Sequence, residues 1–471
     1  MPREFLNKNV TVVGLGLHGG GVGTIRWLLR EGARVLVTDI AKPERLLPSI
    51  LLLQKAGCRA SRRLRFVLGR AHRKEDIVGS QLVVINPDVP RSSPVFRWAE
   101  NEGIPIRIGD TSLFIERSKR RIIGVTGTRG KTTTTALIGS ILRRSDPRAI
   151  VAGNLRVSPL DYLRGKELDG WAALELSSWQ VEGLDNIRRS PNIAVITNIL
   201  PDHRNRYRSM EEYYRAKCGI SRYQQRGDVL VLNRDNRILR DAGCQTRGAV
   251  WWASRRTLPN HLNGAYESRG RVFFQRDGRA LPVCSASSIK LLGAFQIENV
   301  LCAVAATLVA GIPIQTIRAG ISQFRGVSGR LERIRLLHRV SYYNDTAATS
   351  PEATIGALQT LSKRHSGIMI ILGGADKGLE YSQLMDMALR QCRSIVFLPG
   401  SATEKMICVL PPRARQSFAV VSSMNEAVRE ASSRASPGDA VLLSPAAASF
   451  GLFLHAYDRG EQFANAVDEL R

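Results

Sequence analysis

The segment that most constrains how this chain can fold is a glycine-rich string between an apolar strand and a helix. An apolar run, Ile122 to Val125, leads into Thr126-Gly127-Thr128-Arg129-Gly130-Lys131-Thr132, and apolar residues with helical spacing follow. A strand, such a turn and a helix in this order form a phosphate-binding loop, in which backbone N–H groups face phosphate oxygens. Lys131 then offers a cation and Thr132 a magnesium ligand, so we expect the chain to bind a nucleotide.

A second strand–turn–helix unit opens the chain. Residues 9–14 are expected to form a buried strand that runs into glycines at positions 14, 16 and 19, and a strand over residues 34–39 ends on Asp39. This is a Rossmann-like pattern, in which glycines let the backbone approach phosphates at a helix N-terminus. Taken alone, it also fits an NAD-dependent oxidoreductase, but that class leaves the Lys131 loop unexplained.

Further strands alternate with helical stretches along the rest of the chain. We expect strands at residues 82–85, 172–176, 193–197, 229–232, 368–372, 394–398 and 440–443, an irregular strand-rich region at 250–292 and an Ala-rich helix at 297–310. Such alternation predicts parallel sheets, and 471 residues exceed what one hydrophobic core supports. We predict three α/β domains: a Rossmann-like domain at 1–120, a phosphate-loop ATPase-like domain at 121–327 and a Rossmann-like domain at 328–471.

Composition narrows the class of protein. No stretch approaches the roughly 20 apolar residues of a membrane helix, and residues 1–5 lack the design of a signal peptide, so we expect a cytoplasmic protein without membrane insertion. The seven cysteines are odd in number and never form a CxxC motif. They are therefore expected to be reduced packing residues.

The net charge of +27 favours anionic partners. A nucleic-acid-binding NTPase is one such class, but the chain has no recognition motif, and its Lys and Arg residues are spread along the whole length. A general compositional bias, helped by polyanionic substrates, is the simpler interpretation, and no nucleic-acid partner is expected.

The string from Gly124 to Thr132 resembles the ATP loop of the Mur ligases and the folylpolyglutamate synthases. Members of these families have three domains, activate a carboxylate with ATP as an acyl phosphate and let an amine attack it to form an amide. The resemblance implies an ATP-dependent ligase. It also assigns ATP contacts to Gly127, Thr128, Arg129, Gly130, Lys131, Thr132 and Thr133.

Three downstream motifs are similar to the magnesium site of the family. Glu175 lies in a strand-end motif at 174–180, His203 ends the next such motif at 197–203, and Lys217 ends the segment Tyr213-Tyr214-Arg215-Ala216-Lys217, whose lysine is carbamoylated in many Mur ligases. The cofactors implied are ATP and Mg²⁺, with Lys217 as a carbamate. The implied metal set is Thr132, Glu175, His203 and Lys217, and the implied catalytic set is Lys131, Glu175, His203 and Lys217.

Other positions match contacts that the family makes with its nucleotides. Asn299, Arg330 and Asp345 resemble residues that reach ATP. Four further positions, by the same resemblance, contact the UDP-linked substrate: Leu17, His18, Asp39 and Asn154.

The C-terminal segments 443–450 and 459–463 are similar to those of the family members that add D-glutamate. The resemblance places the amino acid against Lys377, Ser449 and the N–H of Phe450. It implies a monomeric ligase that joins D-glutamate to UDP-N-acetylmuramoyl-L-alanine in peptidoglycan synthesis. Another Mur or folylpolyglutamate-type ligase with a different amine remains the alternative.

Overall fold

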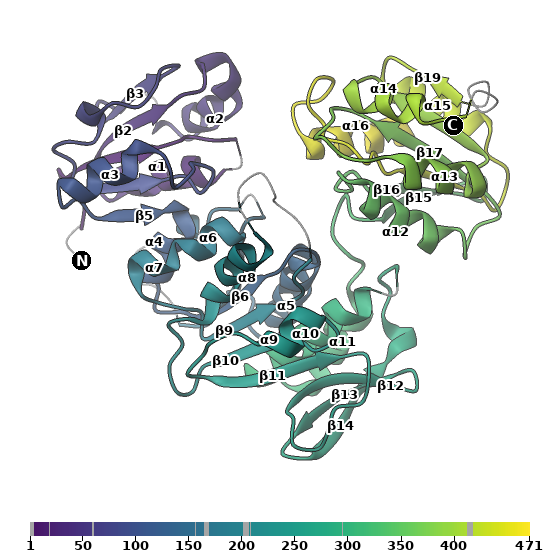
Figure 1. The fold of residues 1–471 in the computed structure, drawn as a ribbon, viewed down its shortest axis with the longest axis horizontal. Coiled ribbons are helices and arrows are strands. Elements are labelled where there is room, and N and C mark those ends of the chain that lie inside the picture. The colour runs from purple at the N-terminus through teal and green to yellow at the C-terminus, as the bar shows by residue number, and fades with distance from the viewer. Residues whose placement is uncertain are drawn as a thin grey trace. The chain divides into compact units, whose positions relative to one another are not determined.

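The fold is that of a computed structural model of the chain, shown as a ribbon in Figure 1. It describes residues 4–17, 19–58, 61–155, 157–163, 169–200, 207, 209–293, 295–411 and 418–471. Within these ranges, no helix is both long enough and apolar enough to span a bilayer.

The first sheet has five parallel strands in the order β3-β2-β1-β4-β5. The strands are β1 Asn9–Val13, β2 Arg34–Asp39, β3 Leu64–Leu68, β4 Leu82–Ile85 and β5 Ile106–Ile108. The accompanying helices are α1 Gly20–Arg30, α2 Pro43–Lys55, α3 Pro94–Asn101 and α4 Gly109–Arg117. All four residues of β4 are buried, as is usual for a parallel strand that is covered on both faces.

The second sheet has nine strands in the order β14-β13-β12-β11-β10-β9-β6-β8-β7. They are β6 Arg121–Thr126, β7 Ile150–Gly153, β8 Trp171–Glu175, β9 Ile193–Ile196, β10 Val229–Asn233, β11 Ala249–Ser254, β12 Gly264–Ser268, β13 Arg271–Arg276 and β14 Arg279–Ser285. The helices are α5 Lys131–Ser145, α6 Ser178–Glu182, α7 Leu184–Ile187, α8 Met210–Cys218, α9 Arg237–Ala242, α10 Gln296–Val309 and α11 Ile314–Gln323. The sheet is parallel from β7 to β12, and β12, β13 and β14 are antiparallel.

The third sheet has six strands in the order β15-β16-β20-β17-β18-β19. They are β15 Glu332–Leu337, β16 Val340–Asn344, β17 Ile368–Gly373, β18 Ser394–Leu398, β19 Phe418–Val420 and β20 Ala440–Leu443. The helices are α12 Pro351–Leu361, α13 Ser382–Gln391, α14 Ser401–Cys408, α15 Met424–Ser433 and α16 Ala456–Asp468. Only the pair β15–β16 is antiparallel among these strands.

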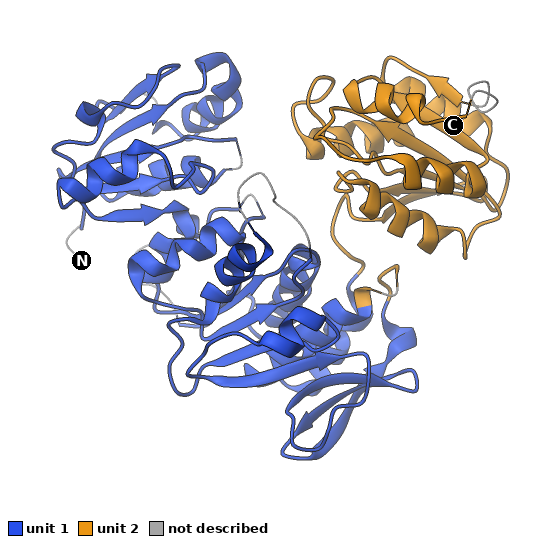
Figure 2. Ribbon diagram, in the orientation of Figure 1, with its two compact units in different colours: residues 1–289, 297–324 blue, residues 290–296, 325–471 orange. Residues whose placement is uncertain are grey.

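Two compact units contain these sheets (Figure 2). The first unit, residues 1–289 and 297–324, holds the first two sheets, because one continuous apolar core includes Val10 and Val35 of the first sheet and Leu174 and Leu230 of the second. The second unit, residues 290–296 and 325–471, has apolar clusters of its own on the third sheet.

The sequence-based prediction of an α/β fold with mainly parallel sheets is confirmed. The predicted strands at 34–39 and 82–85 coincide with β2 and β4, and the predicted helix at 297–310 is α10 shifted by one residue. The proposed domain boundaries at residues 120 and 327 stay predictions.

Candidate functional site

The phosphate loop joins β6 to α5, and two of its glycines occupy positions that a side chain would not fit. Gly127 has φ 144° and Gly130, the N-cap of α5, has φ 83°. A Cβ atom at Gly130 would lie 2.1 Å from Oδ1 of Asn299, a residue of α10 that is 4 % exposed. The first turn of α10 therefore packs directly on the loop, and its close approach requires glycine at position 130.

The N-terminus of α5 faces the same loop. Gly130 has no side chain to cap the helix, and the first turn of α5 contains no acidic residue. Nζ of Lys131 donates hydrogen bonds to the carbonyl oxygens of Gly127, at 2.9 Å, and Thr128, at 3.1 Å. The N–H groups of the first turn, the positive end of the helix dipole and the ammonium together favour an anion at this position.

The end of β9 fixes the loop from the other side. Asn198 accepts a hydrogen bond from the N–H of Arg129 at 2.9 Å and donates one to its carbonyl at 3.1 Å. The hydroxyl of Thr197 also donates to the Arg129 carbonyl, at 2.5 Å. These three hydrogen bonds restrain the backbone of the loop, which is the part predicted to bind phosphate oxygens.

Helix α8 brings a buried lysine to the loop. Lys217 is 2 % exposed, and its Nζ donates to the carbonyl of Gly127 at 2.9 Å. The same Nζ lies 4.7 Å from the ring centroid of Tyr213, whose hydroxyl is 3.2 Å from the hydroxyl of Thr128. Lys217 is thus no solvated surface lysine, because α8 holds it against the phosphate loop.

Strand β8, which neighbours β6 in the sheet, ends on a buried carboxylate. Glu175 is 2 % exposed, and its Oε1 accepts a hydrogen bond from the side-chain amide of Asn154 at 3.0 Å. Its Oε2 is buried and accepts no hydrogen bond from the described part of the chain. A carboxylate oxygen that is buried in this way needs a cation or a donor. Asn154, predicted to contact substrate, here orients Glu175.

The oxygen donors near the loop suit a hard divalent cation. Thr132, which is 6 % exposed, opens α5 beside the loop, and Glu175 supplies the unfilled Oε2. Magnesium prefers such oxygen ligands. Within the described ranges, no three or more His, Cys, Asp and Glu side chains are grouped so that they could hold a metal ion. His203 and His18, predicted as metal and substrate ligands, lie outside those ranges.

The prediction that all cysteines are reduced is wrong for one pair. Cys218, at the end of α8, forms a disulfide with Cys244, in the segment after α9. The fold brings the two residues together over a sequence separation of 26, which no local motif indicates. Cys58, Cys284, Cys302, Cys392 and Cys408 are free thiols.

Asp39 at the end of β2 holds the N-terminal glycine-rich turn. Its Oδ2 accepts from the N–H groups of Leu15, at 2.8 Å, and Gly16, at 3.4 Å, and its Oδ1 accepts from Ala41 N–H at 2.9 Å. Oδ2 therefore bonds the backbone of the turn, and Oδ1 bonds the segment that follows β2. Asp39 thus holds the glycine-rich turn that the Rossmann-like pattern predicts. Leu17, in the same turn, is half-buried.

In the second unit, Asp345 follows β16 and is almost buried. Its Oδ1 accepts from Leu331 N–H at 2.9 Å and its Oδ2 from the Ser444 hydroxyl at 2.8 Å. Burial raises the pKa of Asp345 to about 7, although these hydrogen bonds and Arg330 act in the opposite direction. Arg330 itself is exposed.

Two loops of the second unit bring the predicted amino-acid contacts together. Ala375 and Ala448 exchange backbone hydrogen bonds of 2.9 and 3.0 Å, which joins the segment that carries Lys377 to the segment that carries Ser449. The exposed Lys377 donates to the hydroxyl of Thr349 at 3.2 Å. Ser449 is 6 % exposed and Phe450 60 % exposed. Thr349 was not among the predicted site residues.

Arg459 of α16 is a second residue of this region that sequence reasoning left without a role. It is fully buried and donates to Thr346 and to the carbonyl of Ala447. Burial lowers its pKa to about 10. The sequence signal was its place in the segment 459–463, which carried the resemblance to the D-glutamate-adding enzymes.

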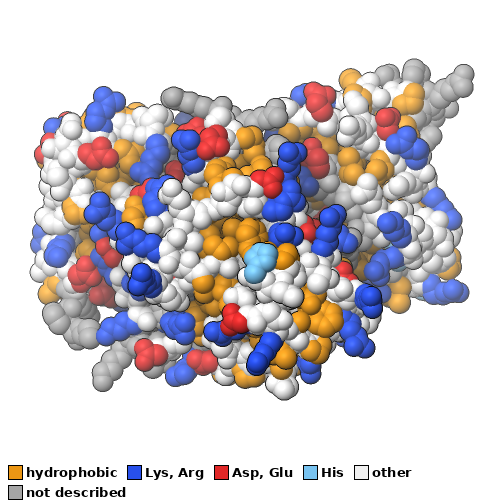
Figure 3. All heavy atoms as spheres, turned by 60° about the horizontal axis from the view of Figure 1, so that its bottom comes forward, with side chains coloured by type: hydrophobic (Ala, Val, Ile, Leu, Met, Phe, Trp, Pro, Cys, Tyr) orange, Lys and Arg blue, Asp and Glu red, His pale blue; other side chains and the backbone are white. Residues whose placement is uncertain are grey.

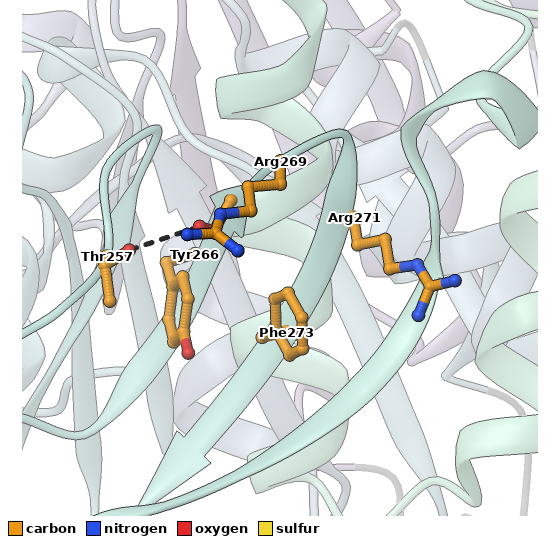
Figure 4. A pocket seen from close by; sticks show the side chains of 6 residues that line it. Thr257, Tyr266, Arg269, Arg271 and Phe273 are labelled. Atoms are coloured by element: carbon orange, nitrogen blue, oxygen red, sulfur yellow. Dashed lines mark hydrogen bonds between the residues drawn. The ribbon is translucent and has the colours of Figure 1, made fainter.

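A hollow of about 460 Å³ lies on the β12–β13 hairpin, and none of the predicted site residues lines it (Figure 4). Tyr266 and Phe273 stack there with ring centroids 5.3 Å apart, beside Arg269 and Arg271. Tyr266 is only 6 % exposed, so its ring face is little available to a ligand. Elsewhere, Lys and Arg side chains are scattered among Asp and Glu over the face drawn in Figure 3, as a compositional bias predicts.

Comparison with known proteins identifies the Mur ligase family along the whole chain. Residues 125–307 match the profile of the Mur ligase middle domain, and residues 329–447 match that of the Mur ligase glutamate ligase domain. The UDP-N-acetylmuramoylalanine--D-glutamate ligase of Roseiflexus sp. is 38 % identical over 99 % of both chains. The enzyme of the same name from Symbiobacterium thermophilum is 35 % identical, again over 99 % of both.

Solved structures share the fold at lower identity. A UDP-N-acetylmuramate-alanine ligase from Thermotoga maritima superposes with a TM-score of 0.60 at 19 % identity, covering 98 % of this chain and 99 % of that one. A MurF ligase from the same organism in complex with ADP gives a TM-score of 0.55 at 16 % identity, covering 100 % and 97 %.

Proposed function

Because the chain belongs to the Mur ligase family, we propose that it joins D-glutamate to UDP-N-acetylmuramoyl-L-alanine at the expense of ATP. The observation that carries this proposal is the match, over 99 % of the chain, to enzymes whose name states that reaction. The role is a step of peptidoglycan precursor synthesis. The reaction passes through an acyl phosphate, which the amine of glutamate attacks to form the amide.

The phosphate loop supplies the electrostatics for the first step. A substrate carboxylate must approach the γ-phosphate of ATP, and two anions repel each other strongly. The N–H groups at the start of α5 bind phosphate oxygens, while Lys131 faces the transferring phosphoryl group. Gly127, Thr128, Arg129 and Thr133 complete the loop, and Asn299 supports it from α10.

Thr132 and Glu175 are proposed to hold Mg²⁺, together with His203 and Lys217. When bound, Mg²⁺ neutralises the negative charge that accumulates between the carboxylate and the phosphates. The buried Oε2 of Glu175 supports this assignment, because it accepts no hydrogen bond from the described part of the chain and a cation would satisfy it. Asn154 holds the other oxygen and so fixes the direction in which Oε2 points.

Lys217 is proposed to act as a carbamate. Its buried position against Gly127 supports this, since a carbamate nitrogen keeps one N–H that can still donate to the Gly127 carbonyl. The added carboxylate then provides oxygen ligands of the kind that magnesium prefers.

The amino acid is proposed to bind in the second unit, with Lys377 paired to a glutamate carboxylate and with Ser449 and the N–H of Phe450 as hydrogen-bonding partners. Support comes from the Ala375–Ala448 pairing, which holds these segments together. Several assignments stay predictions. They are the UDP-substrate contacts of Leu17, His18 and Asp39 and the ATP contacts of Arg330 and Asp345. The same holds for a monomeric cytoplasmic enzyme without nucleic-acid or membrane partners.

A panel of amines tests the proposal. The protein is incubated with ATP, Mg²⁺ and UDP-N-acetylmuramoyl-L-alanine together with D-glutamate, L-glutamate, L-lysine or meso-diaminopimelate. Mass spectrometry then identifies the products. We expect an amide product with D-glutamate alone. A product with another amine and none with D-glutamate would show that the enzyme is a Mur ligase with a different amine substrate.

A further inference from the structure

Arg459 presents an energetic problem that the proposed reaction does not by itself explain. Its side chain is 0 % exposed, and no described carboxylate interacts with it. An arginine is almost never buried without an acidic partner, since removing its charge from water is costly. Carbonyl and hydroxyl oxygens are its described partners, so its positive charge is solvated by dipoles and remains uncancelled.

The hydrogen bonds of Arg459 converge on the loops that carry the amino-acid contacts. Nη2 donates to the Thr346 carbonyl at 2.9 Å and Nε to the Thr346 hydroxyl at 3.1 Å. Nη1 donates to the Ala447 carbonyl at 3.1 Å. Thr346 lies three residues before Thr349, and Ala447 lies two residues before Ser449.

The third loop also approaches this guanidinium. A Cβ atom at Gly374 would lie 3.4 Å from Nη1 of Arg459, and Gly374 lies three residues before Lys377. One planar side chain therefore lies beneath all three segments. The hydroxyl of Thr346 in turn donates to the Ala456 carbonyl at 2.6 Å, which anchors the start of α16 to the same place.

Accepting the proposed function, we infer that Arg459 is a positioning residue that sets specificity for a dicarboxylic amino acid. Its fork holds the three loops at the spacing at which Lys377, Thr349 and Ser449 meet the substrate. Its uncancelled charge makes the electrostatic potential of the pocket positive, which favours glutamate over an amino acid of the same shape without the second charge.

A second arginine of the same unit provides a matched control. Nη1 of Arg335 also donates to backbone carbonyls, those of Val467, Asp468 and Leu470, which close the C-terminal end of α16. Arg335 thus stabilises α16 at the end opposite to Arg459. A purely structural role for Arg459 would make the two arginines equivalent.

The test compares Arg459→Lys, Arg459→Met and Arg335→Met with the unaltered enzyme. Steady-state kinetics give kcat and KM for D-glutamate, ATP and UDP-N-acetylmuramoyl-L-alanine, kcat/KM is also measured for D-glutamine, and thermal unfolding gives Tm. We expect Arg459→Lys, which keeps the charge, to raise the KM for D-glutamate about tenfold and to change the KM for ATP less than twofold.

Arg459→Met should reduce the preference for D-glutamate over D-glutamine by about tenfold or more, because the charge is lost. Arg335→Met should lower Tm and leave the KM values for D-glutamate and ATP unchanged. Equal changes in the KM values for glutamate and ATP, or an unchanged glutamate-to-glutamine preference, would overturn the inference. Failure of the unaltered enzyme to use D-glutamate would instead refute the proposed function. If Arg459→Met does not fold, Arg459→Lys decides through its KM values.

Discussion

The ammonium of Lys217 donates a hydrogen bond of 2.9 Å to the carbonyl of Gly127, a residue 90 positions earlier in the chain. This contact joins the end of α8 to the first glycine of the phosphate loop. It places a buried amine beside the loop that is proposed to bind the phosphates. If magnesium binds there as proposed, an unmodified ammonium would repel it and a carbamate would bind it.

Lys217→Ala is therefore expected to lower kcat severely, by about 10² or more, while the fold and nucleotide binding persist. Acetate at millimolar concentration should restore part of the rate, because it fills the vacated anionic position. Arg215→Ala is the control, since Arg215 lies on the same helix with a side chain that is 73 % exposed. Rescue by added amines in place of acetate, or an unchanged kcat, would contradict the assignment of Lys217.

Gly130→Ala tests the close packing of α10 on the phosphate loop. The new methyl group would lie 2.1 Å from Oδ1 of Asn299, at a φ of 83°. Gly227→Ala is the matched control: its φ is 97°, and a Cβ there would meet no atom within 4 Å. Backbone strain should lower the free energy of unfolding of both variants by about 1 kcal/mol. Gly130→Ala should be destabilised further, because Asn299 must move to admit the methyl group.

Only Gly130→Ala should also raise the KM for ATP, by about tenfold or more, because Asn299 must move and the loop with it. Steady-state rates at varied ATP concentration measure this KM in both variants. Equal KM values for ATP in the two variants would show that Asn299 does not shape the nucleotide site.

The parts of the site that could be predicted are those whose residues lie close together in the sequence. The phosphate loop, Glu175 at a strand end and the strand that leads to Asp39 all follow from short patterns, because a parallel strand and its following turn have a local signature. That Lys217 contacts Gly127, or that Asn154 orients Glu175, depends on how α8 and β7 pack. No short pattern contains that information.

Asp345 gives the folded chain a pH dependence. Its pKa in the fold is about 7, raised from an ordinary value near 3.8 by burial. A carboxyl whose pKa is raised on folding stabilises the fold in its neutral form, so this contribution is present below about pH 4 and is lost as the pH rises through 7.

Asp345→Asn should remove that dependence, which amounts to a few kcal/mol. Urea unfolding at several pH values between 4 and 8, without ligands, measures the difference between the two proteins. We expect the unaltered protein to lose stability relative to Asp345→Asn across this range. Parallel stability curves would show that the carboxyl titrates normally.

The Cys218–Cys244 disulfide should stabilise the first unit. Closing a loop over a separation of 26 residues restricts the unfolded chain, which corresponds to about 3.5 kcal/mol in the chain-entropy model. Dithiothreitol should therefore lower the urea midpoint of the unaltered protein. Cys218→Ala with Cys244→Ala should already show the lower midpoint and should not respond to the reductant.

Cys408→Ala serves as the control for that experiment, because Cys408 is an exposed free thiol and its removal should leave the response to dithiothreitol intact. A midpoint that does not change on reduction would mean that the bond adds no stability. The pairing itself could not be predicted, since seven cysteines of irregular spacing allow many partners and only the packing of α8 against the segment after α9 selects one.

Arg459 shows the same limit at the amino-acid site. The segment 459–463 indicated the kind of ligase, yet the function of its first residue emerges only when Thr346, Ala447 and Gly374 are seen around one guanidinium. Long-range convergence of this kind is a property of the folded chain, and spacing in the sequence does not encode it.

Isotope transfer during turnover is the sharpest test that the protein forms an acyl phosphate and uses D-glutamate. UDP-N-acetylmuramoyl-L-alanine labelled with ¹⁸O in its alanine carboxylate is supplied with ATP and Mg²⁺, with either D-glutamate or L-glutamate, and the inorganic phosphate released is analysed by mass spectrometry. An acyl-phosphate ligase specific for D-glutamate transfers one ¹⁸O atom to each phosphate and turns over only with the D form. Unlabelled phosphate, or equal turnover without any glutamate, would contradict the account.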